Sequence, residues 1–169
     1  MKKLEMGLVQ VYIGRGKGKS CSSLGQALRA AGHGFRIYIC HFSISDYRRD
    51  TLHMEEAVSP KLLRNIRIET FELSDYIDNV IIKPDNSYFR DILQDIRKTI
   101  ESGIYDIVIL DEILQLVSLE LISEEDVISL IDIKPYHTEL ILTGREKDKV
   151  SEIIRRAHLV TEYREIKAV

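Results

Sequence analysis

A glycine-rich segment near the N-terminus contains the residue types that bind phosphate groups. It reads Gly14-Arg-Gly-Lys-Gly-Lys-Ser20 and directly follows the apolar run Leu8–Ile13. Glycines let backbone N–H groups approach phosphate oxygens, and a helix that begins after the loop adds the positive end of its dipole. Lys19 adds a full charge, and the Ser20 hydroxyl is placed to bind Mg²⁺, or Mn²⁺ in its place. The predicted phosphate-binding residues are Gly14, Arg15, Gly16, Lys17, Gly18, Lys19, Ser20 and Cys21.

The spacing inside this P-loop is unusual. The common pattern has four residues between its first glycine and the Gly-Lys pair, and that count puts Ile13 at the first position. Counted from Gly14, the loop is one residue short. We therefore do not expect standard γ-phosphoryl chemistry, because a tighter loop holds a phosphate chain differently. The alternative to a phosphate site, which this motif at a strand–helix junction disfavours, is a glycine turn with a solvated lysine.

An acidic pair, Asp111-Glu112, ends the apolar run Ile104–Leu110. Alone, such a pair commonly starts a helix. Together with a P-loop it predicts carboxylates beside a metal ion at the carboxyl end of the sheet. The predicted metal ligands are Ser20, Asp111 and Glu112, and the sequence does not separate the roles of the two carboxylates.

A third candidate follows the run Glu139–Thr143. The segment Leu142-Thr-Gly-Arg145 ends in a guanidinium group, which suits bidentate binding of an anion. Arg145 is therefore a candidate catalytic residue together with Lys19. A surface arginine in an ordinary strand-to-helix turn is the alternative.

Composition narrows the classes of protein. The chain has 169 residues, 44% of them hydrophobic, and a net charge of −3, which suits one globular domain and argues against a nucleic-acid partner. Residues 1–49 carry nine basic and two acidic side chains, whereas the rest carries 15 basic and 25 acidic ones. This asymmetry predicts an anion near the N-terminus. Two cysteines and five scattered histidines favour neither a disulfide framework nor a histidine-rich metal site. With no apolar leader and no run of about 18 apolar residues, we expect a cytoplasmic protein with no membrane contact.

The elements that must position these residues follow from the apolar pattern. Predicted strands are Leu8–Ile13, Phe35–Phe42, Ile66–Leu73, Ile104–Leu110 and Glu139–Thr143. Predicted helices are Lys19–Ala31, ending at Gly32-His-Gly34, a helix from a Ser87 cap to about Ser102, a short helix opened by a Ser123–Asp126 capping box, and Lys147–Ala157. The alternation predicts an α/β fold of the P-loop (RecA-like) kind, with an open, mostly parallel sheet and helices on both faces, in a single domain 1–169. Residues 43–65 and 74–86 are polar and irregular, and read as loops over a ligand or as surface connections.

These motifs, in this order, resemble the P-loop family of ATP:corrinoid adenosyltransferases. The loop is similar to that family's short Gly-Asn-Gly-Lys-Gly-Lys-Thr, and Leu142-Thr-Gly-Arg145 matches its Leu-Thr-Gly-Arg. The resemblance extends over nearly the whole chain. The other matching segments are Leu28–Gly34, Tyr105–Glu112, Ile133–His137 and Ala157–Lys167.

The resemblance implies transfer of the 5′-deoxyadenosyl group of ATP to the cobalt(I) of a reduced corrinoid, with release of triphosphate. Family members bind ATP reversed along the loop, which suits the short spacing. Lys17, Lys19, a metal ion at Ser20 and Arg145 would stabilise the leaving group. The resemblance also implies ATP and the corrinoid as substrates, Mg²⁺ or Mn²⁺ as the metal, a reductase as partner, and a homodimer.

The sequence departs from the family's motifs mainly in segments that the resemblance assigns to the corrinoid side of the reaction. His41-Phe-Ser-Ile-Ser45 stands where the family has Gln-Phe-x-Lys-Gly, and Ile113-Leu114 replaces Leu-Asn or Leu-Thr. The family's Phe-x-Trp segment has only a loose counterpart in Phe71–Tyr76, and the sequence ends at Val169, before the usual glycine-rich tail. Tyr76, Tyr88 and Phe89 are candidates for a macrocycle pocket, although ordinary core or surface positions are the simpler interpretation.

Two other classes of function stay open from sequence. An ordinary P-loop NTPase or kinase would release ADP, and the shortened loop argues against it. A non-catalytic sensor or chaperone would bind ATP or corrinoid without turnover, and the divergent regions 41–45 and 71–88 favour it.

Overall fold

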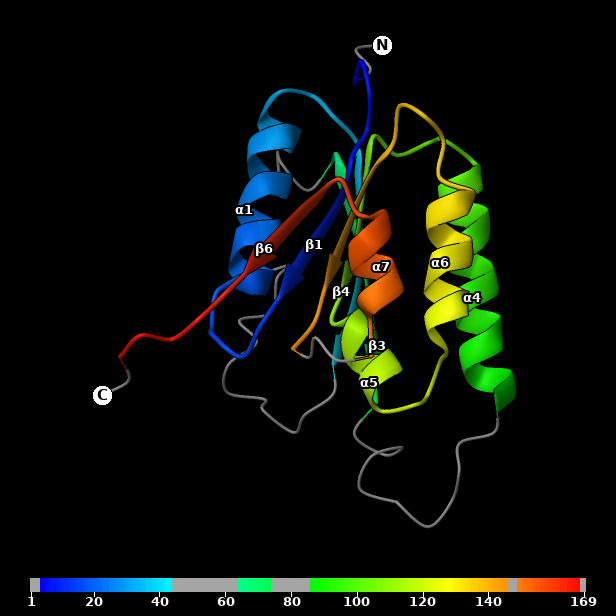
Figure 1. Ribbon diagram of the computed structural model, residues 1–169. Coiled ribbons are helices and arrows are strands. Elements are labelled where there is room, and N and C mark those ends of the chain that lie inside the picture. The colour runs from blue at the N-terminus through cyan, green and yellow to red at the C-terminus, as the bar shows by residue number, and fades with distance from the viewer. Residues whose placement is uncertain (1–3, 44–63, 74–85, 146–148, 168–169) are drawn as a thin grey trace.

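The computed structural model describes residues 4–43, 64–73, 86–145 and 149–167. Within these residues six strands form one sheet, and every pair of neighbours is parallel (Figure 1). The strand order is β3-β2-β4-β5-β1-β6. The strands are β1 (Val9–Ile13), β2 (Ile37–Ser43), β3 (Ile66–Glu72), β4 (Ile107–Asp111), β5 (Glu139–Thr143) and β6 (Leu159–Glu162).

Helices cover both faces of this sheet. The helix α1 (Lys19–Gly32) lies on one face, and the other described helices lie on the opposite face (Figure 1). Those helices are α4 (Asn86–Glu101), α5 (Ile113–Ser118), α6 (Glu124–Asp132) and α7 (Ser151–Arg156). All five residues of β1, β4 and β5 are buried, as expected for central strands of a covered parallel sheet. The predicted α/β architecture is confirmed.

The strand order brings the predicted functional segments to one edge. The strand β5 lies between β1 and β4, so the loops that follow these three strands leave the sheet side by side. The register places Tyr12 of β1 opposite Thr143 of β5, and His41 of β2 opposite Asp111 of β4. Ligands of open α/β sheets bind outside this carboxyl edge.

Several predicted boundaries are confirmed and others are corrected. The run Glu139–Thr143 is β5 at both ends, and Ser123 caps α6 through the predicted capping box with Asp126. The helix α4 is described from Asn86 onward, so Ser87 lies in the first described turn. The last helix begins only at Ser151, because Val150 has a non-helical backbone, and residues 147–148 lie outside the described part. The sequence patterns missed α5 and β6.

Among the described residues, no helix is long and apolar enough to cross a membrane. The irregular regions 43–65 and 74–86 are described only at residues 43, 64–65 and 86.

Candidate functional site

The glycines of the P-loop are required by the backbone that packs against them. Gly14 and Gly18 have φ angles of 109° and 110°, in the left-handed region that side chains disfavour. A Cβ atom on Gly14 would lie 2.3 Å from the carbonyl oxygen of Tyr163, and one on Gly16 would lie 2.9 Å from the backbone of Arg164. The loop therefore has no room for side chains at these two positions.

The segment after β6 fixes the shape of this loop. The backbone N–H of Tyr163 donates to the carbonyl of Ile13 at 2.8 Å, and the N–H of Gly16 donates to the carbonyl of Tyr163 at 3.0 Å. The Tyr163 ring packs on Tyr12, with ring centroids 5.8 Å apart. Sequence reasoning did not identify Tyr163 as a support of the P-loop.

Lys19 places a positive charge inside the loop. Its Nζ atom donates to the carbonyl oxygens of Gly14 at 2.7 Å and Gly16 at 3.0 Å, and the residue is buried. Burial lowers the pKa of the Lys19 ammonium, and the Glu112 carboxylate acts in the opposite direction. The first turn of α1 contains no acidic residue, so the positive end of its dipole is not offset there.

Asp111 is fully buried, and both of its carboxylate oxygens accept hydrogen bonds. The Thr143 hydroxyl donates to Oδ1 at 2.7 Å, and His41 Nδ1 lies 2.8 Å from Oδ2. The Thr143 oxygen in turn accepts the backbone N–H of Glu112 at 2.8 Å. This chain of bonds ties the ends of β2, β4 and β5 together.

Glu112 differs from its neighbour in having a buried polar atom without a partner. Its Oε2 atom is buried and has no hydrogen bond, and its φ of 65° is rare for a residue with a side chain. Burial raises the pKa of the Glu112 carboxyl, and the nearby Asp111 charge adds to this effect. The charges of Lys19 and Arg145 act against the rise. An unpaired carboxylate oxygen in this position fits a bound cation.

Arg145 reaches this cluster from the end of β5. The residue before it, Gly144, packs so closely on α5 that a Cβ atom there would lie 2.5 Å from Leu114 Cβ. The Arg145 charge is close enough to lower the pKa of both Lys19 and Glu112. The structure thus brings the predicted residues Lys19, Asp111, Glu112 and Arg145 near one another.

The other predicted residues lie around this cluster. Ser20 is partly exposed in the first turn of α1, while Arg15, Lys17 and Cys21 are exposed on the loop and the start of that helix. Among the described residues, no group of three or more His, Cys, Asp or Glu side chains is arranged to hold a metal ion by itself. A metal at this site would therefore need additional ligands, such as phosphate oxygens.

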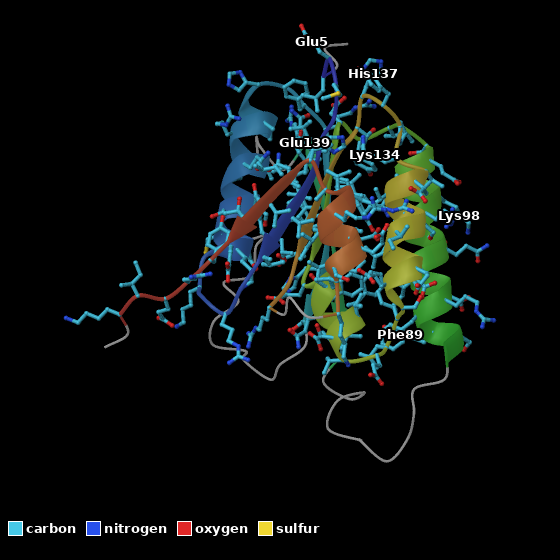
Figure 2. All side chains as sticks on the ribbon, in the orientation of Figure 1. Glu5, Phe89, Lys98, Lys134, His137 and Glu139 are labelled. Atoms are coloured by element: carbon cyan, nitrogen blue, oxygen red, sulfur yellow. The ribbon has the colours of Figure 1, made fainter. Side chains whose placement is uncertain are left out.

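Of the three aromatic residues considered for a macrocycle pocket, two lie in or against the hydrophobic core and one lies outside the described residues. Phe89, at the first turns of α4, is 3% exposed and belongs to the hydrophobic core (Figure 2). Tyr88 is partly buried and meets the Phe89 ring edge-on. The simpler core interpretation is therefore right for Phe89, and Tyr76 lies outside the described residues.

Comparison with known proteins places this site in a family. A family model described as "ATP:corrinoid adenosyltransferase BtuR/CobO/CobP" matches residues 5–169. The chain belongs to this adenosyltransferase family. Named relatives are the corrinoid adenosyltransferase of Escherichia coli (strain K12), 24% identical over 163 residues, and that of Salmonella typhimurium, 26% identical over 163 residues. Each alignment covers 96% of this chain and 79% of the relative.

A solved structure supports the fold of this family member. The flagellar accessory protein FlaH from Methanocaldococcus jannaschii superposes with a TM-score of 0.66 at 16% identity, over 94% of this chain and 72% of that one. At this identity the likeness concerns the fold alone.

The fold also places three residues at this site that the sequence motifs did not predict as site residues. His41 and Thr143 contact Asp111, and Gln115 of α5 has a buried Oε1 atom without a hydrogen bond. Only the strand order could have identified His41, because it sets β2 beside β4.

Proposed function

We propose that this chain transfers the 5′-deoxyadenosyl group of ATP to the cobalt(I) of a reduced corrinoid and releases triphosphate. The observation that carries this proposal is the gathering of Lys19, Arg145 and Glu112 at a P-loop one residue shorter than usual. Membership of the family supports the reaction class. The cationic groups support triphosphate as the leaving group.

The reaction is a displacement at C5′ of the ribose. A cobalt–carbon bond forms with both electrons supplied by cobalt(I), while the C5′–O bond breaks and its electron pair leaves on the triphosphate. No proton moves in this step, so the protein needs no general base. Lys19 and Arg145 would offset the charge that builds on the triphosphate, and the loop N–H groups with the α1 dipole would hold it in line.

The unpartnered Oε2 of Glu112 fits a metal ion that travels with the phosphates. Glu112 and the Ser20 hydroxyl would hold Mg²⁺ or Mn²⁺, while Asp111, whose two oxygens accept hydrogen bonds from Thr143 and His41, would orient the site. A dication bound there supplies further neutralisation of the triphosphate charge.

Product analysis tests the proposal. We expect ATP, a divalent metal and chemically reduced cobalamin to yield adenosylcobalamin and intact triphosphate, separated by anion-exchange chromatography. Release of ADP and phosphate would instead indicate an ordinary NTPase. Tight corrinoid binding without product at any strength of reductant would indicate a non-catalytic relative.

An Arg145→Ala variant links the product to the site. The variant should lower the rate of adenosyl transfer by about 100-fold, because it removes one cation from the leaving group. Lys98→Ala is the matched control, since Lys98 is an exposed cation on α4 that pairs only with Asp95 among the described contacts (Figure 2). Equal rates in the two variants would remove Arg145 from the mechanism.

The family also suggests an assembly. We propose a homodimer, together with a reductase that delivers the reduced corrinoid. Sedimentation velocity of the purified chain measures the first, and adenosylation driven by a flavin reductase instead of a chemical reductant tests the second.

A further inference from the structure

His41 is held rigidly at the edge of the candidate site. It lies at the carboxyl end of β2, opposite Asp111 in the sheet register. Its side chain is 12% exposed, and its Nδ1 atom lies 2.8 Å from Oδ2 of the fully buried Asp111. The ring therefore has one defined partner and little freedom to turn.

The hydrogen-bond chain around Asp111 determines which nitrogen of His41 carries a proton. The backbone N–H of Glu112 donates to the Thr143 oxygen, so the Thr143 hydroxyl donates its own proton to Asp111 Oδ1. A carboxylate has no proton to donate, so as a carboxylate Asp111 accepts at both oxygens, and the Nδ1–H of His41 donates to Oδ2. In the neutral ring this leaves the lone pair on Nε2.

That Nε2 atom is buried and has no hydrogen-bond partner. Burying a polar atom without a partner costs free energy, so such an atom in a site calls for a ligand. The Oε2 atom of Glu112 is in the same condition, and the His41 ring is near enough to affect the Glu112 carboxyl electrostatically. A nitrogen lone pair and a carboxylate oxygen thus lie unused in one charge cluster.

A histidine that donates one N–H to a carboxylate and keeps the other nitrogen free is the usual arrangement of a metal-binding histidine. Imidazole nitrogen suits first-row transition metals, whereas Mg²⁺ prefers oxygen ligands only. We propose that His41 Nε2 is a ligand, beside Glu112, of the dication that accompanies the phosphate chain. The proposal rests on the proposed function only for the phosphate chain that supplies the remaining ligands.

Pulsed electron paramagnetic resonance detects such a nitrogen directly. The purified full chain is mixed with Mn²⁺ and inorganic triphosphate, which contains no nitrogen, so any coupling to ¹⁴N comes from the protein. We expect electron spin-echo modulation typical of a coordinated imidazole, and its replacement by ¹⁵N couplings in uniformly ¹⁵N-labelled protein. A Mn²⁺–triphosphate complex bound to the protein without nitrogen modulation would overturn the proposal, and this measurement needs no variant.

Two variants assign the nitrogen. In His41→Gln we expect the modulation to vanish and the affinity for Mn²⁺, measured with triphosphate present, to fall by about 10- to 100-fold. The affinity for Mg²⁺ should change by less than about threefold, because Mg²⁺ gains little from imidazole. His137→Gln is the matched control, since His137 is exposed at the opposite end of the sheet and contacts the carbonyls of Leu4 and Glu5 (Figure 2). Modulation that persists in His41→Gln would overturn the assignment.

The outcome separates this proposal from the reaction. Nitrogen modulation without formation of adenosylcobalamin would leave the His41 ligand standing while the proposed transfer fails. Adenosylcobalamin formed with no modulation would support the transfer and overturn the ligand. A chain that binds no Mn²⁺–triphosphate would overturn both.

Discussion

The two ends of the sheet differ in how many buried polar side-chain atoms lack a hydrogen bond. At the amino end, the buried Glu139 carboxylate accepts from the amides of Gln10 at 2.5 Å and Gln26 at 2.8 Å, and the Tyr12 hydroxyl lies within 2.9 Å of both amide oxygens. Lys134 Nζ donates to three backbone carbonyls nearby. The polar groups around Glu139 and Lys134, both labelled in Figure 2, thus bond to one another and to nearby backbone.

At the carboxyl end, polar groups are buried without partners. Among the described residues, four buried side-chain atoms lack a hydrogen bond, and three of them belong to His41, Glu112 and Gln115 at this end. The fourth, Arg36 Nε just before β2, is at the amino end and lies 3.8 Å from the Asp106 carboxylate. Glu112 also has a strained backbone. The same protein therefore builds a network that closes on itself at one end and one that stays open at the other. We infer that the closed network stabilises the fold and that the open groups are available to a ligand.

Removing the centre of the closed network should have the largest effect on stability. Glu139→Ala would leave the Gln10 and Gln26 amides without an acceptor, so we expect the free energy of unfolding to fall by about 3 kcal/mol in urea titrations. The control Glu101→Ala removes an exposed carboxylate 3.8 Å from Arg97 and should cost less than about 0.5 kcal/mol. A similar loss in both variants would mean that the network contributes nothing special.

Removing the P-loop charge at the open end should mainly weaken the binding of ATP. Lys19→Ala removes the charge inside the P-loop, and we expect ATP affinity, measured by calorimetry, to fall by about 100-fold, or ~2.7 kcal/mol. Glu139→Ala, at a temperature where it stays folded, should bind ATP with affinity within about threefold of the unchanged protein. Loss of ATP binding in Glu139→Ala would show that the two ends are coupled.

Gly144 at the open end tests whether Arg145 needs a fixed backbone position to act. In Gly144→Ala the new Cβ would meet Leu114 Cβ at 2.5 Å and Gln115 N at 3.0 Å, so β5 and α5 must move apart. We expect a loss of about 1–3 kcal/mol in unfolding free energy and a lower rate of adenosyl transfer, because Arg145 follows directly. Gly25→Ala is the control, since a Cβ there meets nothing within 4 Å. An unchanged rate in Gly144→Ala would show that Arg145 needs no fixed backbone.

The sequence was informative where a pattern is local. Long apolar runs predicted five strands, and the Gly-Lys-Ser and Asp-Glu motifs predicted the residues that meet at the carboxyl edge. The strand β6 was missed because it has four residues, and Leu159 and Val160 in it are exposed. The helix α5 was missed because four of its six residues are buried, which removes the helical period.

The contacts of Asp111 could not be predicted in this way. They join β2, β4 and β5, which lie next to one another only in the folded sheet. No spacing along the chain relates His41 to Asp111, 70 residues apart. The different roles proposed for Asp111 and Glu112 likewise depend on which carboxylate oxygens accept hydrogen bonds in the folded protein, and the sequence does not show this.

The pH dependence of protein stability tests whether Glu112 at the open end is buried without a partner. Burial raises the pKa of this carboxyl in the folded protein above its ordinary value of 4.5. The folded state therefore holds the proton more tightly than the unfolded state. Stability linked to this group is complete below pH 4.5 and is lost as the pH rises through the folded pKa.

The variant Glu112→Gln has no carboxyl group to ionise at this position, so it should not lose this stability as the pH rises. With the metal chelated, we expect the variant to be more stable than the unchanged protein by about 1 kcal/mol at neutral pH, and the difference to shrink toward zero as the pH falls below the ordinary carboxyl value. Urea midpoints from pH 4 to pH 8 measure the difference. The same variant should bind the Mn²⁺–triphosphate complex more weakly, because it loses a carboxylate ligand. A destabilised variant at neutral pH would mean that Glu112 is satisfied within the fold, and that the carboxyl end is as closed as the amino end.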